Sequence, residues 1–318
     1  MIDFRYHIVS IVSIFLALAV GIVLGAGPLQ GEIGASLTNE LAGLRKDKTA
    51  LNDQLKTAET AAEARNGYLT AVSGRVLDGT LRDRSVALVV LPGAEASVSE
   101  AVVETLDTAG ARLASTTSVT QDWVSTEERT ATARDRVVQE VTQQTGANTS
   151  GGSAQARDVL LATLLTRTAP AGDSGPDDPT ARTGLETLAD AGLLSLDAQN
   201  FTRADLVVVV GGTVTDGDQA ARADAAGQWV DLAVALDDRS GGAVLAADLA
   251  SETSGTSVLT TLRGISAAAS EVSGVDDASE PMGLASVVFA LVEQAGGGAG
   301  QYGLGPRTDA AFAPVPQS

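Results

Sequence analysis

Three short apolar runs in this sequence end in residues that could face a ligand. They are Gly93 after the run 86–91, Gly211 and Gly212 after the run that begins at residue 206, and Asp248 after the run 243–247. In an open α/β sheet, ligands usually bind beyond the carboxyl ends of the strands. Paired glycines there let backbone amides approach a phosphate, but the sequence has neither G-x-G-x-x-G after a strand nor G-x-x-x-x-G-K-[ST]. Tight turns are the simpler explanation of these glycines.

Side chains that perform catalysis are scarce. The chain has no cysteine and one histidine, His7, which lies at the start of a long apolar stretch. Thiolate catalysis, zinc–thiolate sites and disulfides are therefore excluded, and the rest of the chain has no histidine for a Ser-His-Asp arrangement. Aromatic residues make up only 3% of the sequence, which argues against a sugar-binding cleft. We expect a protein that is not an enzyme.

The element that organises the chain is the uncharged stretch 8–26. Nineteen helical residues span about 28 Å, close to the roughly 30 Å thickness of a bilayer's hydrocarbon core. Within it, Ser13, Ala17, Gly21 and Gly25 recur four apart and form one small-residue face, along which two transmembrane helices can pack closely. We predict a transmembrane anchor over residues 1–28. The alternative is a cleaved signal peptide, which the acidic Asp3 and the length of the apolar stretch disfavour.

A second helix is predicted over residues 29–83. Its apolar positions are spaced 4-3-4-3, which is the seam of a coiled coil. The seam residues are Leu37, Leu41, Leu44, Leu51, Leu55, Leu69 and Val72, with Lys48 and Arg65 as polar interruptions. Such a stalk covers about 60 Å and points to a homodimer or a higher homo-oligomer. The alternative is a long helix that packs on its own head domain.

Residues 84–318 alternate between strand-like and helix-like runs, which predicts an acidic α/β domain with a mostly parallel, doubly wound sheet. We expect about five strands, at 86–91, 111–118, 206–212, 243–247 and 268–273. Helices are expected at 96–109, 126–145, 157–167, 182–194, 217–236, 254–262 and 281–295. Residues 146–180 read as a flexible insertion around the helix 157–167, and residues 297–318, rich in glycine and proline, read as a loose tail.

The charges restrict the partners. Residues 1–84 hold nine basic and nine acidic side chains, so the whole net charge of −19 lies in residues 85–318. An acidic domain repels nucleic acid, and we expect no nucleic-acid partner. The charges nearest the apolar stretch weakly favour a single-pass protein of the cell membrane, with the large C-terminal domain outside the cytoplasm. The basic residues at 45–48 argue mildly for the reverse orientation.

The N-terminal string resembles the MctB copper transport protein family. The resemblance follows the pattern R-x-H-x-V-S…FLALA-x-G-x-V-L-G, here Arg5, His7, Val9, Ser10, the residues 15–19, Gly21, Val23, Leu24 and Gly25. It extends to the heptad stalk and to an α/β head that opens on VALVVLPG. The resemblance implies a cell-envelope protein in copper transport, with copper as the transported ion, and a proposed pore. A related protein, SteB, is associated with cell separation, which implies an alternative role as a non-enzymatic envelope scaffold for a division partner.

Copper chemistry receives little support from the residues themselves. Cu(I) prefers thiolate and thioether ligands, and Cu(II) accepts imidazole. The chain offers His7 and two methionines, Met1 and Met282. If copper binds directly, Met1 and His7, with Asp3 between them, are the only plausible cluster. A single span lined by small residues also suits close helix packing better than a water-filled pore.

Overall fold

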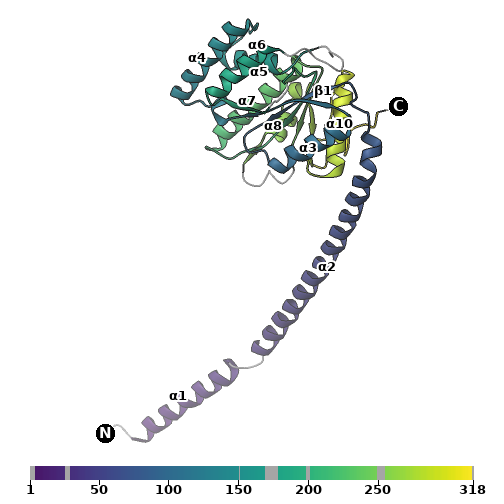
Figure 1. The fold of residues 1–318 in the computed structure, drawn as a ribbon. Helices are drawn as coiled ribbons and strands as arrows, with labels where there is room; N and C mark the ends of the chain where they lie inside the picture. The colour runs from purple at the N-terminus through teal and green to yellow at the C-terminus, as the bar shows by residue number, and fades with distance from the viewer. Residues whose placement is uncertain are drawn as a thin grey trace. The chain divides into compact units, whose positions relative to one another are not determined.

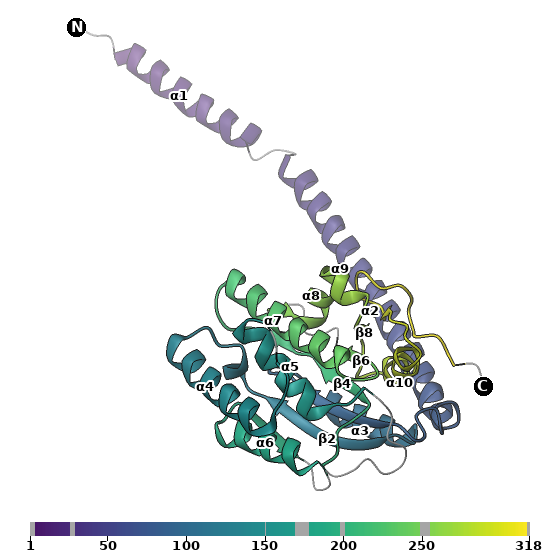
Figure 2. The same ribbon diagram turned by 90° about the horizontal axis from the view of Figure 1, so that it is seen from above.

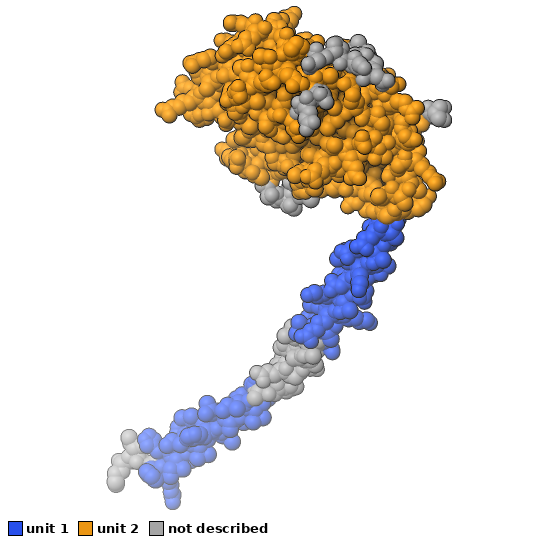
Figure 3. Space-filling view, viewed as in Figure 1, with its two compact units in different colours: residues 1–65 blue, residues 66–318 orange. Residues whose placement is uncertain are grey.

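The structure is a computed structural model that describes residues 4–25, 29–149, 151–168, 178–197, 201–248 and 255–316. The chain divides into two compact units, Met1–Arg65 and Asn66–Ser318 (Figure 3). Each unit is described by itself below.

The first unit begins with α1 (Phe4–Gly25), the helix of the described residues that is long and apolar enough to cross a membrane. None of its residues is buried within the chain. The hydroxyl of Ser13 donates to the carbonyl of Val9 at 2.8 Å, so this polar group has a partner without water. A Cβ on Gly21 or Gly25 would meet no other atom, so the small-residue face is open to another helix.

One continuous helix, α2 (Leu29–Leu77), links the two units. In the first unit its apolar side chains are exposed: Leu41 by 48%, Leu44 by 65%, Leu51 by 64% and Leu55 by 58%. The side chain of Leu37 lies outside the described residues. The exposed stripe matches the predicted seam, but the coiled coil itself stays a prediction.

The last turns of α2 belong to the second unit. Leu69 and Val72 are half-buried, Leu77 is buried, and Asn66 Nδ2 donates to Glu280 Oε2 at 2.5 Å. The head therefore begins at Asn66 rather than at residue 84, because these turns pack against the core of the sheet domain. The alternative of a helix packed on its own head thus holds for this end of α2.

Among the described residues, the second unit contains a seven-stranded sheet in the order β3-β2-β1-β4-β6-β8-β9. Every neighbouring pair is parallel except β2 and β3. The strands are β1 (Ser85–Val90), β2 (Arg112–Val119), β3 (Leu194–Asp197), β4 (Leu206–Val210), β6 (Ala243–Ala246), β8 (Ser273–Val275) and β9 (Gln301–Tyr302). A separate two-stranded sheet pairs β5 (Thr213–Val214) with β7 (Thr256–Ser257). The predicted parallel α/β sheet is confirmed, with β3 and β9 as additional strands.

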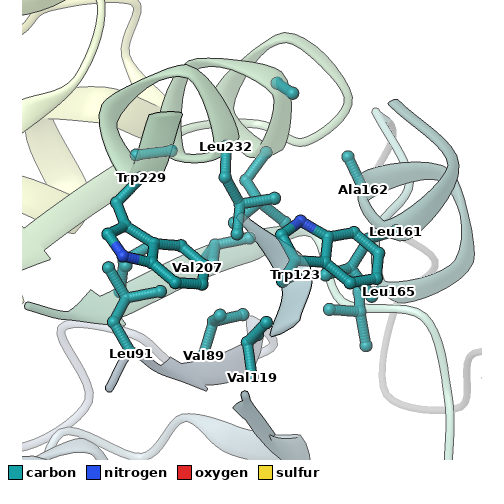
Figure 4. Packing of buried hydrophobic residues seen from close by; sticks show 14 of the residues in the cluster. Val89, Leu91, Val119, Trp123, Leu161, Ala162, Leu165, Val207, Trp229 and Leu232 are labelled. Carbon is teal, nitrogen blue, oxygen red and sulfur yellow. The ribbon is translucent and has the colours of Figure 1, made fainter. Parts of the chain in front are cut away.

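Helices cover both faces of this sheet (Figures 1 and 2). One face packs against α4 (Glu128–Thr145), α5 (Ser153–Leu165), α6 (Pro179–Asp190), α7 (Gln219–Asp238) and α8 (Val258–Gly264). The other packs against α3 (Ala96–Thr108), α10 (Pro281–Ala295) and the end of α2. Short helices η1 (Gln121–Trp123) and α9 (Ser266–Ala269) complete the unit. Figure 4 shows the first core, in which Trp123 and Trp229 lie among Val and Leu side chains of the strands and helices.

The predicted boundaries differ most in the second half of the chain. The helix expected at 182–194 ends at Asp190, and β3 follows within four residues. The strand expected at 268–273 is instead the end of α9 followed by β8. Both are short segments, and in segments this short the helical and strand periods of the sequence cannot be told apart.

The helix predicted at 157–167 is present as α5, but it belongs to the buried core and is not part of a flexible insertion. Helix α5 is buried along most of its length, with Leu160, Leu161 and Leu165 at the core. The helix forms because one face packs on α7 and others on α4 and α6, so its surroundings override the low-complexity flanks. Residues 169–177 lie outside the described residues.

The loose tail predicted from residue 297 is also wrong. Gln301–Tyr302 forms the edge strand β9, and Ala313 is buried. Asp276 fixes the turn after β9, since it accepts the backbone N–H groups of Leu304 at 2.7 Å and Gly305 at 2.9 Å. Several hydrogen bonds and a buried side chain therefore hold this glycine-rich segment.

The turns after β1 and β4 lie against each other. Gly93 has φ +79°, and a Cβ there would lie 2.6 Å from the carbonyl oxygen of Thr213. A Cβ on Gly212 would lie 2.5 Å from the carbonyl oxygen of Pro92 and would also overlap the backbone of Gly93. Only glycine permits two backbones to approach this closely.

Replacing Gly212 by alanine should therefore destabilise the head by about 2 to 3 kcal/mol, because a rigid backbone has to move to admit the methyl group. Urea unfolding of the compact fragment Asn66–Ser318 measures this loss. Gly227→Ala in α7 is the matched control, because no atom lies within 4 Å of its Cβ. The control should be neutral or slightly stabilising. Equal stabilities of the two variants would contradict the close approach.

A carboxylate at the end of α7 makes the head sensitive to pH. Burial raises the pKa of Asp237 from 3.8 to about 6, and Asp238 and Glu271 add to the rise, against a hydrogen bond from the N–H of Ala243. The folded head therefore binds a proton more tightly than the unfolded chain. Its stability should fall as the pH rises from about 4 to about 6 and should stay at the lower value above that range.

Asp237→Asn should raise the free energy of unfolding at pH 7 by roughly 1 to 2 kcal/mol, because an amide oxygen still accepts from Ala243 and carries no charge. At pH 3.5 the variant and the parent should be equally stable. Asp190→Asn, at an exposed position on α6, is the control. Urea unfolding at several pH values is the measurement, and a gain that is the same at pH 3.5 and pH 7 would refute the raised pKa.

Candidate functional site

The structure brings two of the predicted strand-end positions together and fills the space between them with backbone. Gly93 and Gly212 contact each other's turns, and a Cβ on Gly211 would lie 3.2 Å from Leu245 Cδ1. The amide of Gly211 donates to Ala246 at 2.7 Å, and that of Ala94 to Leu91 at 3.1 Å. These amides are therefore already paired within the fold and do not form a cradle for a phosphate.

Asp248, the fourth strand-end residue, lies two residues beyond the end of β6, near other carboxylates. Burial raises the pKa of Asp277 first, and the charges of Asp276, Glu280 and Asp248 raise it further. Asp276 is committed to the turn after β9 and Glu280 to Asn66. Over the described ranges of the chain, no group of three or more His, Asp or Glu side chains is arranged to hold a metal ion.

The structure describes two of the candidate copper ligands, His7 and Met282, and they belong to different units. His7 is exposed on α1 in the first unit, and Met282 lies on α10 in the second. Met1 and Asp3 lie outside the described residues. The small-residue positions Ser13, Ala17, Gly21 and Gly25 lie on α1, and the exposed leucines of the predicted seam lie on α2.

The head instead contains buried ion pairs that sequence reasoning missed. In the first, Arg157 Nε lies 2.9 Å from Asp158 Oδ1, and both side chains are almost fully buried. The guanidinium lies 5.6 Å from the centre of the Trp123 ring, whose Nε1 donates to Asp158 at 2.8 Å. Burial raises the pKa of Asp158, and the hydrogen bonds and charge of Arg157 oppose that rise. The signal in the sequence that could have revealed this pair is the position of two adjacent charged residues at the start of a leucine-rich run.

A second pair joins the amino ends of the central strands. Asp205, just before β4, accepts the N–H of Ser85 at 2.7 Å and the hydroxyl of the same residue. Arg84 lies 3.4 Å and Arg167 3.8 Å from its carboxylate. Burial lowers the pKa of Arg167, Asp205 opposes this, and the charges of neighbouring arginines lower it further. Partners 120 residues apart left no local signal in the sequence.

A third pair anchors the C-terminal segment. Arg263 on α8 lies 2.7 Å from Asp276 and donates at 2.7 Å to the carbonyl of Tyr302 in β9. Burial and the hydrogen bond with Glu293 raise the pKa of the Tyr302 hydroxyl. In all three pairs the charged groups hold loops and strand ends in place. None of the three pairs includes a histidine, because the only histidine of the sequence is His7.

Comparison with known proteins places this architecture in a family. The family model described as "Copper transport outer membrane protein, MctB" matches residues 1–313. Proteins named copper transporter MctB from Mycobacterium bovis and Mycobacterium tuberculosis are 30% identical over 314 residues, which covers 96% of this chain and 97% of theirs. The protein of the same name from Mycobacterium leprae is 30% identical over 323 residues, again 96% of this chain and 97% of the relative. The resemblance carried by the N-terminal string is confirmed, and the chain belongs to the MctB family of copper transport outer membrane proteins.

Proposed function

We propose that this chain is a non-enzymatic, membrane-anchored protein of the cell envelope that takes part in copper transport and lowers the copper content of the cell. The observation that carries the proposal is the family match over residues 1–313, which includes the apolar helix as well as the head. The relatives that match across 96% of the chain are named as copper transporters. The absence of histidine and cysteine from the head agrees with a role that is not catalytic.

In this proposal copper is the transported ion and not a resident cofactor. A tight copper site needs several sulfur or imidazole ligands, and the described residues offer no such group. If this chain contacts copper directly, Met1 and His7 at the membrane end are the contacting residues. Further ligands have to come from a partner or from additional copies of the chain.

The anchor we propose is α1, as a single pass, with the acidic head outside the cytoplasm. Its apolar length, the absence of buried residues and the open small-residue face support a helix whose surroundings are lipid and other helices. The exposed leucines of α2 support a second copy of the chain as the partner along the stalk. Leucines repeated at heptad spacing lose water contact when two such helices pair.

A scaffold role is the second candidate. It is favoured by the lack of a metal-binding group in the described head together with the exposed stripe of α2. A scaffold would hold an envelope or division protein and would leave the copper content unchanged.

Deletion of the gene should raise total cell copper at sub-toxic external copper, and the intact gene should restore it. Elemental analysis of washed cells measures this. A complementing gene with His7→Ala should restore copper as well as the parent gene if the chain has no direct ligand, and should fail if His7 contacts the ion. Unchanged copper after deletion would reject the transport role and favour the scaffold.

Pairing along α2 can be tested with a single cysteine, because the chain has none of its own. Leu55→Cys lies on the seam, whereas Thr57→Cys lies about 200° away around the helix. Under mild oxidation in membranes, the Leu55 variant should form disulfide-linked dimers in most chains and the Thr57 variant in few. Equal crosslinking at the two positions would contradict a seam.

A further inference from the structure

A groove of about 680 Å³ opens on the head between α3 and the end of the sheet formed by β2 and β3. Its floor is apolar, with Leu88 of β1, Val103 of α3, and Ala111 and Leu113 at the start of β2. Leu113 is 39% exposed, although it lies in β2, a strand that is paired on both sides. Exposed apolar surface inside a groove is typical of a binding surface.

The groove is open because the connections of the chain leave this corner of the sheet uncovered. Helix α3 lies between β1 and β2 in the chain, and it packs its buried residues Val98, Val102 and Leu106 on the core. The next helices, α4 to α6, pack with the core of the opposite face. On the α3 face, no helix of the described residues follows to cover the part of the sheet beyond α3.

The rim of the groove is negatively charged on both sides. Glu100, Glu104 and Asp107 line it from α3, and Asp197 lines it from β3. These four are all the charged residues of the lining, so its charge is uniformly acidic. The three on α3 follow the 4-3 spacing that places them along one ridge, parallel to the helix axis.

We propose that this groove binds an amphipathic helix of a partner protein, with apolar side chains on the floor and lysine or arginine side chains along both flanks. A helix that lies parallel to α3 presents side chains at the same 4-3 spacing as the acidic residues of α3. Docking of one face of an amphipathic helix into an apolar groove is a common mode of recognition. The acidic rim disfavours nucleic acid and anionic lipid. We favour a partner protein over a second copy of this chain as the occupant. The basic stretch of this chain, 45–48, lies on the part of α2 whose exposed leucines we propose to pair with α2 of another copy.

The test uses the full chain in lipid nanodiscs and two labelled helical peptides with leucine at heptad positions. One peptide carries lysine on the flanks, and the other carries glutamate at the same positions. Fluorescence anisotropy should show that the lysine peptide binds the parent protein and that added salt weakens the binding. The glutamate peptide should bind at least about tenfold more weakly, a difference of about 1.4 kcal/mol.

Charge reversal on the protein makes the test specific to the groove. Glu100→Lys combined with Glu104→Lys should weaken the lysine peptide about tenfold or more and should strengthen the glutamate peptide. The matched control reverses Glu128 and Glu140, which are exposed on α4. Leu113→Ser should weaken both peptides, with circular dichroism confirming that each variant is folded.

Several results would overturn the proposal. They are no binding of the lysine peptide, equal binding of the two peptides, or the same losses in the α4 control. A peptide of residues 39–58 that competes with the lysine peptide at equal affinity would make a second copy the occupant and would reject a partner protein. Because the readout is peptide binding, the copper measurements neither support nor weaken this inference.

Discussion

The fold of the head depends on burying both faces of its central parallel strands. β1 and β4 are almost entirely buried, and their valines and leucines alternate between two separate cores. A strand of this kind needs helices on both faces of the sheet. The connections between successive parallel strands supply these helices. With few aromatic residues available, both cores consist mainly of valine, leucine and alanine; the two tryptophans lie in the first core, and Phe289 and Tyr302 lie in the second. The close turns at Gly93 and Gly212 and the ion pair at Asp205 then fix the two ends of the same central pair.

The parts of the fold that the sequence predicts well are those with strong local patterns. VALVVL and LVVVV read as buried strands, and the helices 96–109 and 281–295 agree with α3 and α10 within a few residues. β3 and β9 carry too few residues to show a period, and they form because a paired neighbour supplies their hydrogen bonds. The sequence places Gly93, Gly211 and Gly212 directly after strands, as in the structure. That the two turns pack against each other depends on tertiary contacts, which the sequence does not show. The same holds for Asp205 and Arg263, whose partners only folding brings together, whereas Arg157 pairs with its neighbour in the sequence, Asp158.

The family assignment and the chemistry of the side chains point to different parts of the molecule. The match over residues 1–313 covers anchor, stalk and head alike, whereas the few residues with an affinity for copper lie at Met1, His7 and Met282. The head contains carboxylates and arginines that pair with one another. A role in copper transport therefore agrees better with the binding of partner proteins or further copies of the chain than with copper ligands in the head. The small-residue face of α1, the exposed stripe of α2 and the acidic groove are surfaces of the described residues that such assembly could use.

The position of β9 at the sheet edge has a consequence for the strand beside it. β9 pairs in parallel with β8, and the carbonyl of Tyr302 is one of the acceptors for the buried Arg263. Without β9, β8 would be an open edge and the buried arginine would be short of a partner. Because an unpaired strand is a site at which another chain can add, residues 301–302 protect the head from edge-to-edge association.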